Sequence, residues 1–488
     1  MADSCNRTAS GSCSTAFGFQ TRASGPASLA EGSNTLAEGS STHAEGFQTY
    51  ASGDASHTEG SNTVASSTAA HAEGYLSVAS GAAAHAEGLM SNAAGAGAHG
   101  EGIGTNALFN ASHAEGSNTS AMNLSAHAEG NQTVASGISS HAEGENSSAT
   151  GTTAHAEGQG TTATGQSSHA QGESTQASGR ASHAQGYQSA ASGIYAHAEG
   201  QLTDASGDLS HAEGNQTVAS GQNAHAEGAL NTASGFTSHA EGVNTVASGF
   251  FSHTEGQSTN ANMLEGVHVM GQFGSANELS YSWYLANGTD ASTPGLAAKI
   301  LSDGNVKIDG TVSSPAADYA EMLQTADGQP IGPGYFVTLE EDKVRTAHER
   351  DGYILGVTSA KPAFLSDSGE MRWKDKFLTD EWGVALYETV IIPPVFDARG
   401  LIAVPERPVR RPVLNPAWDP ALEYIPRSRR KEWVAVGMLG KLLVRDNGTC
   451  KPNGYCRPDS RGVAAPSDNT GYRVLRRTGP NQILILFR

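Results

Sequence analysis

Basic residues are nearly missing from the first half of this 488-residue chain. Residues 1–260 contain only Arg7, Arg22 and Arg180, and the formal net charge of the whole chain is −20. Binding to nucleic-acid phosphates needs clustered lysine and arginine, so we expect no nucleic-acid partner. Most of the other basic residues lie beyond Ser314, which indicates two physically different parts.

Long apolar runs are also missing. No run approaches the roughly 20 residues that a membrane-spanning helix needs, and no charged segment followed by an apolar one opens the chain. We therefore expect no membrane insertion and no secretion signal.

Cysteine is scarce, with four residues in the chain. Cys450 and Cys456 flank the turn-like segment Lys-Pro-Asn-Gly-Tyr, and no zinc-type CxxC pair is present in the sequence. A disulfide between these two cysteines is sterically plausible, and reduced thiols in a loop are the simpler interpretation.

Glycine, in contrast, is abundant, with 59 residues, and it accompanies an internal repeat. Glycine does not occupy every third position, which excludes collagen. The typical unit reads Ser-His-Ala-Glu-Gly-x-x-Thr-x-Ala-Ser-Gly-x-x, and Leu29 takes the histidine position upstream. Histidine recurs every 14 residues at 43, 57, 71, 85, 99, 113, 127, 141, 155, 169, 183, 197, 211, 225, 239 and 253, where we expect the series to end.

The repeat predicts short extended segments rather than helices. Each half-repeat carries a glycine that would cost about 1 kcal/mol in a helix, and no large apolar residues form a coiled-coil seam. Two short strands and two corners per 14 residues form one coil of a parallel β-roll, with glycine supplying positive φ at the corners. Alternation along a strand places His and Glu on one face and the intervening Ala inside.

The His/Glu face has two interpretations. The histidines could be metal ligands, or they could be interface residues bonded to glutamate or backbone. Gln171 and Gln185 replace glutamate without disturbing the repeat, which favours the interface interpretation, so we expect no metal site and no cofactor. The position before Ala-Ser varies freely, as at Tyr50 and Asp204, and is interpreted as facing solvent. We infer a homotrimer whose inner ladders are His and Glu.

These repeats resemble the head of YadA-like trimeric adhesins over roughly residues 9–266. The resemblance implies a left-handed parallel β-roll and a trimer. The larger residues Phe273, Tyr281, Trp283 and Tyr284 follow, and residues 299–311 predict a hairpin that turns at Asp303-Gly304. We interpret this region as a β-rich collar that closes the roll.

The C-terminal part has an ordinary globular composition. Apolar and β-branched runs predict strands at residues 335–339, 353–358, 383–387, 433–436 and 483–487. Prolines between Pro393 and Pro416 predict a long irregular loop. The fold expected for the whole chain is therefore all-β, a trimeric left-handed parallel β-roll solenoid with a mostly β C-terminal domain.

Asp318 and Glu321 stand where the repeat region gives way to this domain. Two carboxylates held close share a proton, so that one can accept a proton from an attacking group while the other protonates a leaving amine. Acids at this spacing are usually an ordinary solvated surface, and the pair alone is weak evidence.

The surrounding motifs resemble the intramolecular-chaperone peptidase domain of Bacillus phage neck-appendage proteins. They are Ser314-Pro-Ala-Ala-Asp-Tyr-Ala-Glu-Met, Gly334-Tyr-Phe-Val-Thr-Leu, Tyr353-Ile-Leu-Gly-Val, Thr379-Asp-Glu-Trp-Gly, Gly471-Tyr-Arg-Val-Leu and Ile483-Leu-Ile-Leu. The resemblance implies a domain that promotes trimerisation and then cuts itself off, acting once on its own chain. It implies Asp318 and Glu321 as the catalytic acids and a cut near Ser313–Ser314 or Ser314–Pro315.

We therefore expect three parts: repeats over residues 1–266, a collar over residues 267–313 and a self-cleaving domain over residues 314–488. The expected function is that of a fibre or adhesin of a phage tail or neck appendage, or of a Gram-positive surface appendage. Such a protein would assemble in the cytoplasm and be carried on a virion or a cell surface, with a host receptor or glycan as partner. An uncleaved cell-surface adhesin is the first alternative, and a glycan-degrading appendage is the weaker second.

Overall fold

The computed structural model describes residues 5–370, 375–396, 400, 402–421 and 423–488. The chain divides into two compact units, Met1–Thr311 and Val312–Arg488. Both are built from β-strands, and the single helical element in the described residues is the 3₁₀ turn η1 (Arg427–Arg429). No helix in this part of the chain is long and apolar enough to cross a membrane.

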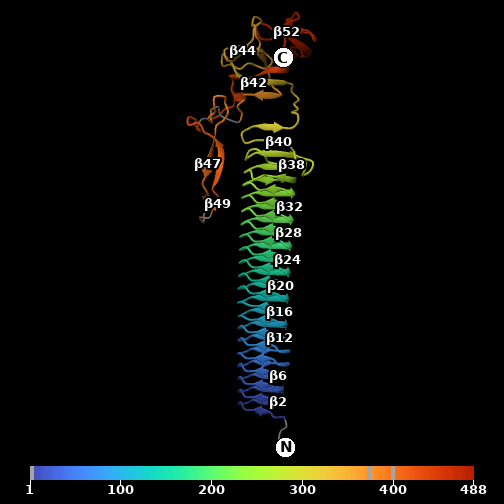
Figure 1. Ribbon diagram of the computed structural model, residues 1–488, viewed down its shortest axis with the longest axis vertical. Helices are drawn as coiled ribbons and strands as arrows, with labels where there is room; N and C mark the ends of the chain where they lie inside the picture. Colours follow the sequence, from blue (N-terminus) through green and yellow to red (C-terminus); the bar gives the residue numbers. More distant parts are fainter. Residues whose placement is uncertain (1–4, 371–374, 397–399, 401, 422) are drawn as a thin grey trace. The chain divides into compact units, whose positions relative to one another are not determined.

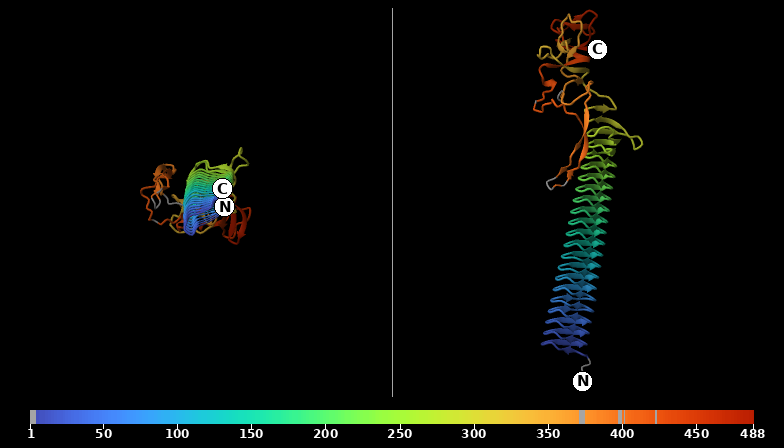
Figure 2. Two further views of the ribbon diagram at one scale, coloured as in Figure 1. Left: turned by 90° about the horizontal axis from the view of Figure 1, so that it is seen from below. Right: turned by 60° about the vertical axis from the view of Figure 1, so that its left-hand side comes forward.

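The first unit is a parallel β-solenoid, as the repeat predicted (Figure 1). Each coil has a longer strand that begins at the ladder histidine, such as β12 (His85–Leu89), and a two-residue strand, such as β13 (Asn92–Ala93). Every strand pairs in parallel with its equivalent one coil further on, so that β12 pairs with β14 (His99–Ile103) in the register His85↔His99. Seen edge-on and end-on, the coils from β1 (Thr8–Ala9) to β37 (Gln257–Asn260) stack in one column (Figure 2).

Small residues fill the inside of each coil. Ala86 and Ala93 are fully buried, as are Ala114 and Ala121 in a later coil, and a buried Ser or Thr stands beside them. His85 and Glu87 flank Ala86 and are half-buried on the outer face of the strand. The predicted alternation of His and Glu outside with Ala inside is confirmed.

The corners differ from the expectation that glycine makes all of them. Gly88 does have a positive φ of +102°. Non-glycine residues such as Ala83 and Met90 also take a positive φ, at a spacing of seven residues. Gly81, in the other half-repeat, is needed for a different reason, because a Cβ there would lie 1.9 Å from the carbonyl oxygen of Gly95 in the next coil. The coils are therefore packed backbone against backbone.

The histidines form one continuous stack. Ring centroids of neighbouring histidines lie 4.8 Å apart for His43 and His57 and 4.7 Å apart for His239 and His253. The expectation that the series ends at His253 is wrong, because His268 stacks on His253 at 4.5 Å. The spacing here is 15 residues rather than 14, and the extra residue is absorbed before the register His253↔His268. Trp283, at 5.0 Å from His268, ends the stack.

The last coils carry a core of larger residues. Strands β38 (His268–Ser275) and β39 (Trp283–Asn287) continue the parallel stack, and β40 (Leu296–Ile300) and β41 (Val306–Ile308) add antiparallel strands. The core contains Val267, Val269, Tyr284 and Leu301. The hairpin predicted at Asp303-Gly304 is confirmed by the pairing of β40 with β41.

The second unit is a mixed sheet centred on the 13-residue strand β51 (Trp433–Arg445). The other strands are β42 (Asp318–Gln324), β43 (Phe336–Glu340), β44 (Lys343–Thr346), β45 (Gly356–Thr358), β46 (Phe364–Ser366), β52 (Tyr455–Pro458), β53 (Ala464–Ser467), β54 (Tyr472–Gly479) and β55 (Gln482–Phe487). β51 pairs with β42 and β45 through its first part and with β55 through its second. Phe336, Val444, Ile483 and Ile485 are fully buried in its core.

Two predictions about the middle of this unit are wrong. Gly383 lies in a turn and residues 383–386 form no strand, because β47 (Tyr387–Ile392) begins only at Tyr387. The expected irregular loop contains an antiparallel ribbon of β47 with β50 (Arg407–Pro412), followed inward by β48 (Val395–Phe396) and β49 (Ile402–Val404). Pro408 and Pro412 are four residues apart, so both lack an N–H on the same edge, and alternate residues can still bond to β47. Residues 397–399 and 401 of the expected loop lie outside the described residues.

Cys450 and Cys456 are both buried and free, with Cys456 on β52 rather than in a loop. A hydrogen bond with Cys456, together with burial, raises the pKa of the Cys450 thiol well above its usual value. The two cysteines therefore belong to the core as reduced thiols.

Candidate active site

The two candidate acids lie on β42, which is held between two strands of the second unit. Asp318 is paired with Gly440 on β51, and Glu321 is paired with Val436 on β51 and with Ser366 on β46. The carbonyl oxygen of Asp318 also accepts a hydrogen bond of 2.9 Å from the N–H of Ala363. The backbone of both acids is therefore fixed on both sides.

The side chains of the two acids do not lie on the same face of β42. Asp318, Ala320 and Met322 are buried, whereas Tyr319 is exposed and Glu321 is half-buried, as alternation along a strand requires. The prediction that one chain holds both acids together thus meets a strand that points them in opposite directions. Any joint action needs a group from outside this strand.

Asp318 is an unusual buried acid. It is 6% exposed, and its Oδ2 atom is buried without a hydrogen-bond partner among the described residues. Burying a carboxylate oxygen without a partner costs free energy, so such groups are often retained for chemistry or for a partner not yet bound. This orphaned oxygen is the strongest mark of function in the second unit.

Two glycines of β51 make room for Asp318, and sequence reasoning missed both. A Cβ on Gly437 would lie 3.3 Å from Asp318 Oδ2, and a Cβ on Gly440 would lie 2.1 Å from the carbonyl oxygen of Ala317. The ladder shifts register between Tyr319 and Ala320, opposite these glycines. The available signal was the spacing Gly437-Met-Leu-Gly440 inside a strand-like run, which is typical of a bulge or a close backbone approach.

The candidate cleavage residues Ser313, Ser314 and Pro315 lie just past the boundary between the two units, and all three are exposed and outside any strand. The Ser314 Oγ accepts a hydrogen bond of 3.2 Å from the N–H of Ala316. Firm attachment to β51 begins at Ala317, whose carbonyl oxygen accepts a hydrogen bond of 3.2 Å from Lys441 N–H. An exposed peptide therefore precedes a buried acid by a few residues.

Comparison with known families matches both units. Residues 276–482 match the Peptidase_G2 family, described as an autoproteolytic cleavage domain of the intramolecular-chaperone type. Residues 9–35, 128–154, 205–229 and 232–252 match the YadA head domain repeat.

Curated relatives match about a third of the chain. The pre-neck appendage proteins of Bacillus phages B103 and phi29 are 35% identical over 182 residues and 36% identical over 169 residues. These alignments cover 36% and 34% of this chain but only 19% and 18% of the relatives, so the chain matches about a fifth of their length. The putative phage-related protein YobO of Bacillus subtilis is 33% identical over 177 residues, which are 36% of this chain and 20% of YobO.

Among solved structures, the C-terminal fragment of bacteriophage phi29 gene product 12 is 33% identical, covers 35% of this chain and 100% of the fragment, and has a TM-score of 0.28. The family matches agree with both resemblances found in the sequence. The chain therefore joins YadA head repeats to an autoproteolytic cleavage domain of the Peptidase_G2 family.

Proposed function

We propose that the chain is a fibre or adhesin of a phage tail or neck appendage, which its own C-terminal domain cuts once after assembly. The observation that carries the cleavage is the buried, unpartnered Oδ2 of Asp318, a few residues after an exposed segment at the boundary between the units. The names of the relatives support the phage appendage, and the absence of a strong cleft-like insertion in the repeats leaves a glycan-degrading role without support.

The proposed reaction is hydrolysis of one peptide bond, Ser313–Ser314 or Ser314–Pro315. One carboxylate accepts a proton from the attacking group as it adds to the carbonyl carbon, and the other acid donates a proton to the leaving nitrogen. The products are a carboxyl group at the end of the fibre and a free amino group on the released domain. Asp318 and Glu321 are the proposed acid–base pair.

Denaturing gels and intact mass spectrometry of freshly expressed protein test this proposal. The wild-type chain should appear as two fragments that meet at residue 313 or 314, and Asp318→Asn and Glu321→Gln should stay whole. Asp342→Asn removes an exposed acid from the same domain and should still be cut. An intact wild-type chain, or cleavage in both acid variants, would refute self-cleavage by these residues.

We also propose that the chain is a homotrimer in solution. The uniform His/Glu face and the match to YadA head repeats support this, because a single thin coil stack buries little apolar area by itself. Sedimentation equilibrium of the Asp318→Asn chain should give three times the chain mass of 50.1 kDa. A monomer at working concentrations would overturn the trimer.

The C-terminal domain is proposed to act as the assembly chaperone, with assembly in the cytoplasm and the fibre then carried on the virion. Near-identical coils make slipped registers almost equal in energy, so a globular end that sets the register has a clear use. A chain ending at residue 312 should aggregate or form mixed species when expressed alone, whereas the same segment released by cleavage should stay a uniform oligomer. Equal behaviour of the two would refute the chaperone role. A host-surface receptor or glycan is the proposed partner of the fibre.

A further inference from the structure

The ladder histidines direct their Nε2 atoms along one line outside the solenoid. From His43 to His268 every ladder Nε2 is a buried atom without a hydrogen-bond partner among the described residues. The rings are nearly parallel, with an interplanar angle of 4° between His71 and His85. A buried imidazole nitrogen without a partner is costly, and here the cost is repeated in every coil.

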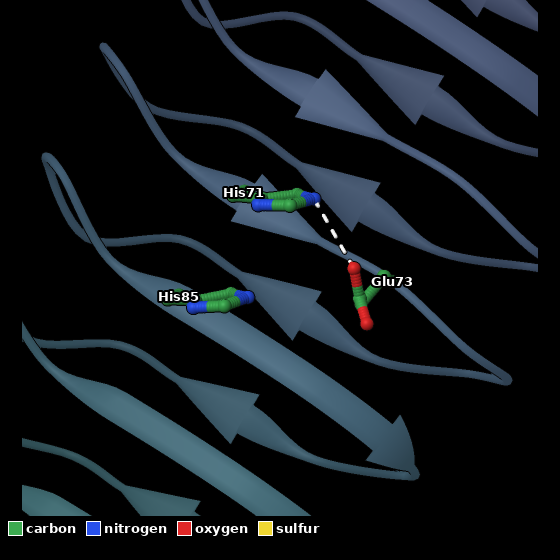
Figure 3. A group of neighbouring side chains, drawn as sticks. All are labelled: His71, Glu73 and His85. Atoms are coloured by element: carbon green, nitrogen blue, oxygen red, sulfur yellow. Dashed lines mark ion pairs between the residues drawn. The ribbon is translucent and has the colours of Figure 1, made fainter.

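A glutamate carboxylate lies beside each pair of neighbouring histidines. The Nε2 of His71 lies 3.6 Å from Glu73 Oε2, and the donor atoms of His71, Glu73 and His85 all lie within 4.8 Å of one another (Figure 3). The same grouping recurs, for example, at His127–Glu129–His141 and His155–Glu157–His169. One ligand per coil thus becomes a mixed, local set of ligands, because stacking brings neighbouring coils together.

These donors match the preferences of borderline transition metals. Two imidazole nitrogens and one carboxylate oxygen form a common zinc set that leaves a further position for water, with metal–ligand distances of about 2.0–2.2 Å. The donor atoms would need to close by about 1 Å around such an ion. The His71 and Glu73 side chains are 34% and 36% exposed, which leaves them free to make that movement.

The local charge also suits a cation. Lysine is missing from residues 1–260, and the three arginines there, Arg7, Arg22 and Arg180, lie outside the ladder positions. Burial, and then the neighbouring histidines, lower the pKa of His127 and His141, which keeps these imidazoles neutral and able to donate a lone pair at neutral pH. The lone pairs and the carboxylates are therefore not already occupied by a competing cationic side chain.

We propose that the His/Glu face of the solenoid binds borderline divalent transition-metal ions such as Zn²⁺, each held by two stacked histidines and the glutamate between them. The site is complete within one chain and does not depend on the proposed trimer. Adjacent groups share a histidine, as His127–Glu129–His141 and His141–Glu143–His155 share His141. One Nε2 supplies one lone pair, so ions fill at most alternate groups.

The sequence contains an internal contrast for this proposal. Gln171 and Gln185 replace glutamate beside His169 and His183, and a neutral amide is a much weaker ligand than a carboxylate. The ladder should therefore contain a gap in metal binding between His169 and His197. Restoring the carboxylate there should add a site.

Equilibrium dialysis of the chelator-stripped full chain carrying Asp318→Asn against ZnCl₂, with elemental analysis, tests the proposal. Several zinc ions should bind per chain. The number should fall in the double variant Glu129→Gln/Glu157→Gln and rise in Gln171→Glu/Gln185→Glu. The matched control Glu145→Gln/Glu173→Gln removes two exposed carboxylates from the neighbouring column and should leave the number unchanged.

Replacement of zinc by Cu²⁺ gives a second measurement that reports the ligands directly. Electron paramagnetic resonance should show nitrogen hyperfine coupling from imidazole, and thermal melting followed by circular dichroism checks that all variants stay folded. Failure of the chain to bind zinc would overturn the proposal. An equal loss of zinc in the ladder variant and in the matched control would also overturn it, since diffuse binding to carboxylates would then explain the ions.

Discussion

Asp318 and Gly440 are paired across β42 and β51, and Gly440 has a φ of +111°. A Cβ at this glycine would lie 2.1 Å from the carbonyl oxygen of Ala317, the residue at which the chain becomes fixed after the candidate cleavage segment. The position of Asp318 therefore depends on a residue more than a hundred positions later in the sequence.

Gly440→Ala should abolish self-cleavage. The new methyl group pushes Ala317 and Asp318 away from β51, and the strained φ adds a cost of about 1–2 kcal/mol. The measurement is the fraction of cut chain on a denaturing gel over time. Gly352→Ala, where a Cβ would meet nothing within 4 Å, is the control in the same domain and should be cut normally. Normal cleavage in Gly440→Ala would show that this pairing does not position the acid.

The opposite faces of Asp318 and Glu321 predict complementation between chains. If the acids act as a pair, they come from neighbouring chains, so neither Asp318→Asn nor Glu321→Gln alone should be cut. Co-expression of the two variants should restore partial cleavage, because mixed trimers contain at least one intact pair. Intact mass spectrometry of the fragments shows which variant was cut. No cleavage in verified mixed trimers would place both acids in one chain.

Gly81→Ala should destabilise the solenoid. A methyl group 1.9 Å from the Gly95 carbonyl oxygen must push two coils apart, and forced overpacking typically costs about 1–3 kcal/mol. Because each coil contacts only its neighbours, the damage should be local and should appear as faster hydrogen exchange around residues 79–95. Gly310→Ala, with nothing within 4 Å and no positive φ, should exchange as the wild type does.

The Arg345–Asp351 pair predicts a pH-dependent part of the stability of the C-terminal domain. Hydrogen bonds from Arg345 lower the pKa of Asp351 to about 2, below its ordinary value of 3.8. A depressed carboxyl pKa stabilises the fold above the ordinary value, and this contribution is lost as the pH falls through about 2. Asp351→Asn should therefore cost about 1 kcal/mol at neutral pH and almost nothing near pH 2. Urea denaturation of the Asp318→Asn chain with and without this change measures the difference, and a cost that does not shrink in acid would contradict the assignment.

How much the sequence predicted follows from how local each feature is. The period of 14 and the alternation of His, Ala and Glu predicted the solenoid and its faces, because each coil repeats the same short-range rules. The continuation of the ladder to His268 was missed because a one-residue insertion hides it from a fixed spacing. The glycine corners were half right, since close packing between coils depends on residues 14 positions apart.

The candidate site was predictable in its residues and not in its geometry. Motifs pointed to Asp318 and Glu321, yet their opposite orientations became clear only once residues 318–324 were known to form a strand. Gly437 and Gly440 act on Asp318 through a long-range pairing that no local pattern reveals. The ribbon of β47 and β50 was missed because prolines are tolerated in a two-stranded sheet whose outer edges are unpaired.

The unbroken 14-residue register has a genetic consequence. Duplication or loss of one repeat adds or removes a single rung of about 4.8 Å and leaves both ends of the stack unchanged. Near-identical repeats also favour recombination between copies. The reach of this molecule can thus be lengthened or shortened in equal steps during evolution, without any new solution to the folding problem.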